Sequence, residues 1–90
     1  MAKKIAVVVR DKQAEALRMA VGLTLADDEV SVFVMDKKLE EGEGVPLNVE
    51  TLGDLDARIY TNTAENSDFE LMSTEDIARE LVNYDVVIPY

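Results

Sequence analysis

Cysteine, histidine and tryptophan are all absent from this chain of 90 residues. Without cysteine the chain can form no disulfide and offers no thiolate nucleophile, no persulfide and no sulfur ligand for a metal. Without histidine it also lacks the side chain that most often acts as a base or a metal ligand near neutral pH. The composition therefore favours a protein without catalytic residues, and we expect neither a cofactor nor a metal site.

Positive charge is also scarce, because nine Lys and Arg face nineteen Asp and Glu, a net charge of −10. Such a chain repels phosphate backbones and anionic lipid surfaces, so we expect neither a nucleic acid nor a membrane as a partner. The charge is uneven: residues 1–25 contain five basic and two acidic residues, a net charge of +3, which leaves −13 for the rest. The acidic segment 26–56 is typical of a solvated face.

Long hydrophobic runs are missing as well. The run Ile5–Val9, which follows Lys3 and Lys4, is too short for the core of a signal peptide or for a membrane span. We therefore expect a cytoplasmic protein. Hydrophobic residues still make up 48% of the chain, which is enough for the core of a folded protein, and the length predicts a single domain, 1–90.

The hydrophobic pattern predicts an α/β fold. The β-branched run Ile5–Val9 is typical of a strand that is buried on both faces, and the short connections that follow it indicate a parallel βαβ unit. We expect a single three-layer domain with a mostly parallel, four-stranded sheet, in the strand order 2-1-3-4. The expected elements are strands at 4–9, 29–35, 57–61 and 85–89 and helices at 12–26, 48–53 and 74–82.

Residues that cap helices stand at the expected helix ends. We expect Asp11 to accept hydrogen bonds from the first amides of helix 12–26, Asn48 to cap the short helix that Gly53 ends, and Ser73 to cap helix 74–82. Helix 12–26 is apolar around most of its circumference, and Gly22 would let another helix approach closely. This pattern predicts a homo-oligomer in which the apolar surface is covered.

Polar side chains follow the first and third expected strands, at the edge where open α/β sheets bind ligands. Asn66 and Ser67 lie in the second of these loops. The alternative is that the basic side chains are solvated or paired with carboxylates and that the hydroxyls cap turns, which is the commoner use of these residue types. The candidate residues for binding an anion or a polar partner side chain are Arg10, Asp11, Lys12, Thr61, Asn62 and Thr63.

Two other kinds of site are disfavoured by the spacing of residues. The turn Val9–Gln13 contains no glycine, so neither a dinucleotide-binding fingerprint nor a P-loop can form there. The acidic groups at Asp54–Asp56 and Glu40–Glu43 lack the alternating oxygen ligands of an EF-hand loop. We therefore expect no metal at either segment.

A family resemblance rests on segments that together span nearly the whole chain: Lys4–Val9, Ala16–Leu23, Glu29–Asp36, Ile59–Asn62, Ile77–Leu81 and Asp85–Ile88. In their order and character these segments resemble the DsrE/DsrF-like family of small sulfur-relay proteins. The resemblance implies a three-layer α/β domain, homo-oligomeric assembly and, in active members, a persulfide-carrying cysteine near the end of the third strand. Here that region is Tyr60–Thr63, so the cysteine has no counterpart.

Two functions follow as expectations. The first is a non-catalytic DsrE-like protein, unable to carry a persulfide itself, that acts as an oligomeric binding or partner subunit associated with sulfur metabolism. The alternative is a small enzyme, or a protein that binds an anion or small ligand, using carboxylate and hydroxyl groups at the carboxyl edge of the sheet. In that case Asp11 is the residue best placed to act as an acid or base.

Overall fold

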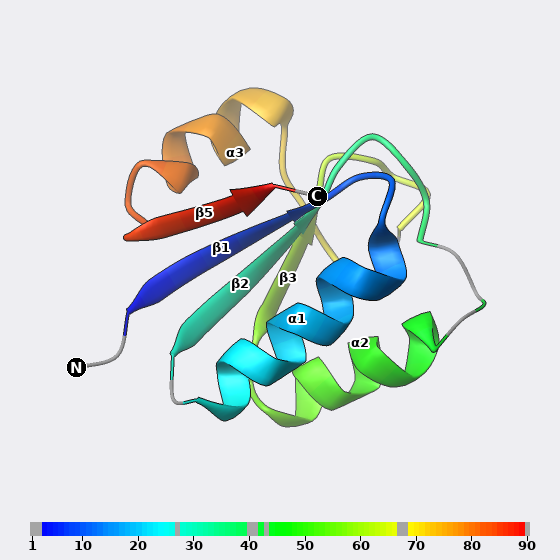
Figure 1. Ribbon diagram of the computed structural model, residues 1–90. Coiled ribbons are helices and arrows are strands. Elements are labelled where there is room, and N and C mark those ends of the chain that lie inside the picture. The colour runs from blue at the N-terminus through cyan, green and yellow to red at the C-terminus, as the bar shows by residue number, and fades with distance from the viewer. Residues whose placement is uncertain (1–2, 27, 40–41, 43, 67–68, 90) are drawn as a thin grey trace.

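The computed structural model describes residues 3–26, 28–39, 42, 44–66 and 69–89 and has the predicted α/β architecture. Parallel strands and helices follow one another along the chain (Figure 1). The sheet has five strands rather than the four expected. The elements are β1 (Lys4–Val9), α1 (Gln13–Leu25), β2 (Glu29–Val34), α2 (Val45–Asp54), β3 (Arg58–Thr61), β4 (Glu70–Leu71), α3 (Thr74–Leu81) and β5 (Val86–Pro89).

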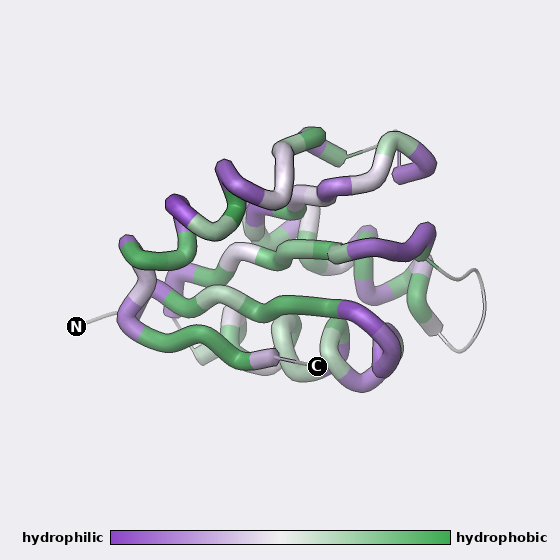
Figure 2. The backbone as a smooth tube through the Cα atoms, turned by 90° about the horizontal axis from the view of Figure 1, so that it is seen from above, coloured by the Kyte–Doolittle hydropathy of each residue, from purple (hydrophilic) through white to green (hydrophobic). Residues whose placement is uncertain are grey.

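Two helices cover one face of the sheet and one helix covers the other. The strands lie between α1 and α2 on one side and α3 on the other, and most of the strand residues are hydrophobic (Figure 2). The larger core, beneath α1 and α2, includes Val7, Leu17 and Leu52, and the smaller one, beneath α3, includes Phe33 and Ile77. Because β1 and β2 are buried on both faces, the three-layer arrangement accounts for their continuous hydrophobic runs.

The strand order is β4-β3-β2-β1-β5, so the predicted order 2-1-3-4 is wrong. The strand β2 lies between β1 and β3, and β5 pairs with the other side of β1. Right-handed crossovers whose helices pack on one face of the sheet add each new strand on the same side of the one before it. A crossover whose helix packs on the opposite face moves the chain across the sheet in the reverse direction. Since α1 and α2 share a face, the chain moves from β1 to β3, and α3 then returns it to β1.

The short strand β4 was not predicted. It has only two residues, Glu70 and Leu71, which pair in parallel with Tyr60 and Thr61 of β3. A segment this short shows no hydrophobic alternation, and it follows a polar stretch that has the composition of a loop. The strand forms because the edge of β3 is available to it.

The predicted start of α2 is wrong, because the helix begins at Val45 rather than at residue 48. Gly44 occupies the N-cap position with φ +81°, a left-handed conformation that glycine adopts easily, and Pro46 lies in the first turn. Asn48 therefore lies inside the helix and does not cap it. Gly53 also lies inside the helix, which ends at Asp54.

The predicted cap at the start of α3 is confirmed, and the predicted cap at the start of α1 is wrong. The Ser73 hydroxyl oxygen accepts a hydrogen bond from the Asp76 amide at 3.1 Å, as predicted for the start of α3. Asp11 does not cap α1, because Lys12 is the N-cap residue and no side chain caps the helix there. The Asp11 carboxylate forms an ion pair with Lys37 instead.

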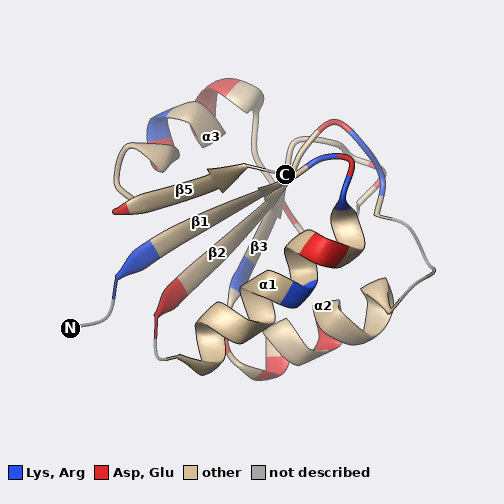
Figure 3. Cartoon of the chain, in the orientation of Figure 1, with Lys and Arg blue, Asp and Glu red and all other residues tan. Residues whose placement is uncertain are grey.

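The amino ends of the strands carry charges of alternating sign across the sheet. In the spatial order β5, β1, β2 and β3, the charged residues are Asp85, directly before β5, and Lys4, Glu29 and Arg58, the first residues of the other three strands (Figure 3). The Lys4 amide also donates a hydrogen bond to the Asp85 carboxylate at 2.8 Å. Opposite charges on adjacent strands favour this arrangement of the edge.

No helix in the described part of the chain combines the length and apolar character needed to cross a membrane.

Candidate functional site

The loops that follow β1, β2 and β3 meet at the carboxyl edge of the sheet (Figure 1). This edge brings together five of the six candidate residues: Arg10, Asp11, Thr61, Asn62 and Thr63. The contacts that join them run largely through the loop after β2, which was not among the predicted site residues. The site is therefore a network of three loops rather than the two-loop crevice expected.

Asn62 and Asp36 form the exposed part of this network. The Asp36 amide donates to the Asn62 Oδ1 atom at 2.7 Å, and the Asn62 Nδ2 atom donates to the Asp36 carboxylate at 2.9 Å. The same Nδ2 donates to the Thr74 hydroxyl at 3.0 Å, which links the network to α3. The Arg10 guanidinium lies 3.7 Å from the Asp36 carboxylate, so Arg10 is engaged by a neighbouring acid.

The backbone of Asp36 is left-handed, with φ +68°. Aspartate tolerates this region better than most residues because its short side chain can bond locally. The paired hydrogen bonds with Asn62 hold this conformation and turn the chain sharply out of β2. An aspartate directly after a strand is the sequence signal that could have indicated this turn.

Asp11 and Lys37 form an ion pair between the loops that follow β1 and β2. The hydrogen bond and positive charge of Lys37, with a smaller effect from Arg10, lower the pKa of the Asp11 carboxyl below its ordinary value. Both side chains are exposed, so water and salt screen the pair.

Replacing Lys37 by glutamine should raise the pKa of Asp11 towards its ordinary value, because the main cause of the lowered value is removed. The pair contributes to folding above the unfolded-state pKa of Asp11, and this contribution is lost as the pH falls through the lower pKa of the folded state. An NMR titration of the Asp11 side-chain carboxyl measures the change. Lys3→Gln, at the opposite end of β1, is the matched control, and an equal shift in both variants would contradict the assignment.

Thr61 and Asn66 form the buried part of the network. The Thr61 hydroxyl donates to the Val34 carbonyl at 2.9 Å and accepts from the Thr63 amide at 3.2 Å and from the Asn66 Nδ2 atom at 3.1 Å. Thr61 is fully buried and Asn66 is only 7% exposed. The Thr61 hydroxyl, at the end of β3, is therefore occupied by contacts within the protein.

Asn66 also joins the loop after β3 to the loop after β2. Its Oδ1 atom accepts from the Leu39 amide at 2.9 Å, and its Nδ2 atom donates to the Lys37 carbonyl at 3.0 Å. Gln13 acts in the same way from α1, since its buried side chain donates to the Lys38 carbonyl at 3.2 Å. Backbone groups of the loop 37–39 thus receive their partners from two amide side chains.

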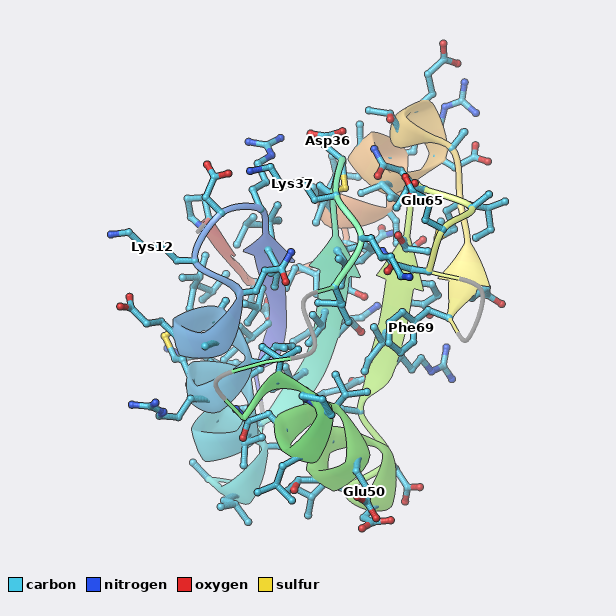
Figure 4. All side chains as sticks on the ribbon, turned by 90° about the vertical axis from the view of Figure 1, so that its right-hand side faces the viewer. Lys12, Asp36, Lys37, Glu50, Glu65 and Phe69 are labelled. Carbon is cyan, nitrogen blue, oxygen red and sulfur yellow. The ribbon has the colours of Figure 1, made fainter. Side chains whose placement is uncertain are left out.

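Lys12 is the one candidate residue that the structure places apart from this network. In Figure 4 its side chain extends into solvent on the opposite side of the molecule from Glu65, with Asp36 and Lys37 between them. Its exposed position at the N-cap of α1 agrees with a solvated lysine. Ser67 and the acidic residues Glu40, Glu41 and Glu43 lie outside the described residues.

The contacts among these residues at this edge join the loops to one another. Every buried side-chain nitrogen and oxygen in the described segments has a hydrogen-bond partner. No group of three or more acidic residues in these segments is arranged to hold a metal ion. Two cavities lined by described residues lie elsewhere, one of about 150 Å³ at the amino ends of β2 and β3 and one of about 280 Å³ beside β3 and β4.

No protein-family model, curated protein or solved structure matches this chain. The assignment of a function therefore depends on the residues and their geometry.

Proposed function

We propose that this protein is a non-catalytic DsrE-like subunit that acts through self-association and partner binding in a process related to sulfur metabolism. The observation that carries the proposal is the state of Thr61. The resemblance places a persulfide-carrying cysteine in this region, and the residue here is a buried threonine whose hydroxyl bonds to three groups of the protein. The hydrogen bonds of this hydroxyl link the ends of neighbouring strands and loops, and they favour a structural role for Thr61 rather than a role as a nucleophile.

Self-association is supported by exposed apolar side chains next to the edge strand β5. Val82 is 81% exposed at the end of α3, and Val87 is 42% exposed on β5, on either side of the turn at 83–85. An edge strand with an exposed valine, close to a second exposed valine at the end of a helix, is a natural surface for pairing with a second copy. The neighbouring Pro89 ends the strand, which limits how far such pairing can extend.

The alternative function, acid or base chemistry at Asp11, has less support. The pKa of Asp11 is lowered, and a carboxylate with a lowered pKa is a weaker base at neutral pH. The Asp11 carboxylate is also held in an ion pair with the Lys37 ammonium group. Both observations favour a structural role for this pair.

The test is the mass of the native protein, measured by native mass spectrometry and light scattering. We expect an oligomer, and we expect the double substitution Val82→Asp with Val87→Asp to weaken its association at least tenfold, because burying an unpaired carboxylate at an interface is costly. The matched control is Leu47→Asp, which places the same charge on α2 at a leucine that is 66% exposed. Circular dichroism checks that each variant is folded.

Two results would overturn this assignment. A wild-type protein that remains monomeric at high micromolar concentration has no self-association to explain. An oligomer that the double variant and Leu47→Asp weaken equally would place the interface elsewhere.

A further inference from the structure

A groove of about 280 Å³ lies beside β3, lined by Arg58, Ile59, Tyr60 and Glu70 and open to solvent. It lies at the amino end of the two-residue strand β4. The β4 ladder reaches Tyr60 and Thr61 only, so the first half of β3 extends beyond it. The groove is therefore a consequence of unequal strand lengths at this edge of the sheet.

Three side chains of the groove lie on the face of the sheet that α3 covers in part. Arg58 and Tyr60 are two residues apart on β3 and so point to the same face, and Glu70 is the direct partner of Tyr60 across the strands. One interstrand step and two residues separate Arg58 from Glu70, a Cα distance of roughly 8 Å. The groove thus has a cationic side chain and an anionic side chain at opposite ends.

These two charges do not neutralise each other. The ion pairs of the described side chains are Arg10 with Asp36, Lys37 with Asp11 and Arg79 with Asp76, and none involves the groove. Both Arg58 and Glu70 are exposed. The neighbouring hydroxyl of Tyr60 raises the pKa of Arg58. An arginine side chain is charged at any physiological pH even without such a shift.

Between the two charged side chains, the groove is lined by the aromatic ring of Tyr60, which packs against other rings. The ring of Tyr60 stacks on that of Phe33, with centroids 5.2 Å apart and planes 19° apart, and Phe33 meets Tyr84 edge to face at 5.7 Å. Phe33 is fully buried, so it anchors the position of Tyr60. A side chain that is held in place in this way loses little entropy when a ligand binds against it.

We propose that this groove binds a small zwitterion of the amino-acid class, with its carboxylate on Arg58, its ammonium group on Glu70 and an apolar or aromatic side chain against Tyr60. An α-amino acid carries a carboxylate and an ammonium group a few bonds apart, so each of its charges has a partner of opposite sign in the groove. The volume lies just below the ~300 Å³ at which sites for drug-sized ligands begin, as expected for a small ligand. The proposal is independent of self-association at β5.

The test is an NMR titration of the backbone amides with L-phenylalanine as the probe. We expect saturable shifts at residues 58–60 and 70. We expect at least fivefold weaker binding of 3-phenylpropanoate, which lacks the ammonium group, and of phenethylamine, which lacks the carboxylate, because each loses one charge-assisted contact. Binding should also weaken as salt is added.

Two variants and two matched controls locate the binding site. Arg58→Gln and Glu70→Gln should each weaken binding at least fivefold, whereas Arg79→Gln on α3 and Glu50→Gln on α2, at the bottom of Figure 4, should leave it unchanged. Circular dichroism and light scattering on each variant report folding and association separately from ligand binding.

The proposal is overturned if no saturable shift appears up to about 50 mM probe, or if the two analogues bind as well as the amino acid. It is also overturned if Arg58→Gln changes the mass of the native protein, because the groove is then an interface between protein chains. Loss of self-association with ligand binding intact would remove the proposed function and leave this site.

Discussion

Replacing Phe33 by alanine should lower the free energy of unfolding by about 3–5 kcal/mol, the range found when a buried aromatic side chain is truncated. Phe33 is fully buried at the centre of the smaller core and contacts the rings of Tyr60 and Tyr84. Among the described residues, the one helix that covers this part of the sheet is the eight-residue α3, so few side chains can move to fill the cavity. Urea denaturation followed by circular dichroism measures the loss.

The matched control for this change is Leu25→Ala. Leu25 is 68% exposed at the end of α1, so its truncation should cost less than about 0.5 kcal/mol. Domains of this kind are stable by about 5–15 kcal/mol, which means that the Phe33 variant loses a large share of the total. A loss below about 1 kcal/mol would show that the aromatic cluster contributes little to the smaller core.

Replacing Asn66 by alanine should cost about 2–4 kcal/mol, because it removes three hydrogen bonds, two of them to backbone groups in a partly buried setting. The groups affected are the Leu39 amide, the Lys37 carbonyl and the Thr61 hydroxyl. Hydrogen exchange of the Leu39 amide should also accelerate, since its acceptor is lost. Denaturation and exchange together test whether Asn66 joins the loops as described.

Two further variants sharpen this test. Asn66→Asp retains an acceptor for the Leu39 amide but cannot donate when ionised, so it should be nearly as destabilising as alanine at neutral pH and less so in acid. Asn83→Ala changes an exposed asparagine in the turn before β5 and should have little effect. Equal losses for Asn66→Ala and Asn83→Ala would contradict the role assigned to Asn66.

Local sequence patterns predicted most of the elements but not all their ends. The run Ile5–Val9 and the Ser73 cap depend on neighbours in the chain, and both appear as expected. The start of α2 differs from the prediction because a cap at Asn48 competes with Gly44 followed by Pro46. Both signals were in the sequence, and the second prevails because proline suits the first turn of a helix.

The sequence predicted where the candidate residues lie but not which residues they contact. The residues after β1 and β3 do meet at one edge of the sheet. Their partners, Asp36 and Lys37, come from the loop after β2, because β2 lies between β1 and β3. Asp11 pairs with Lys37 instead of capping its own helix. Lys37 is 26 residues away in the sequence, so only the fold brings the two side chains together.

The amino-acid sequence already determined that the protein has no thiol, and it indicated the buried strands and the helices α1, α2 and α3. Composition and hydrophobic periodicity are local properties, so they can be read without the fold. The tertiary structure decided the strand order, the pairing of the polar side chains and the groove between Arg58 and Glu70. These features depend on which strands become neighbours, and that choice follows from the face of the sheet on which each helix packs. A hydrogen bond or a groove between distant residues exists only once that choice is made.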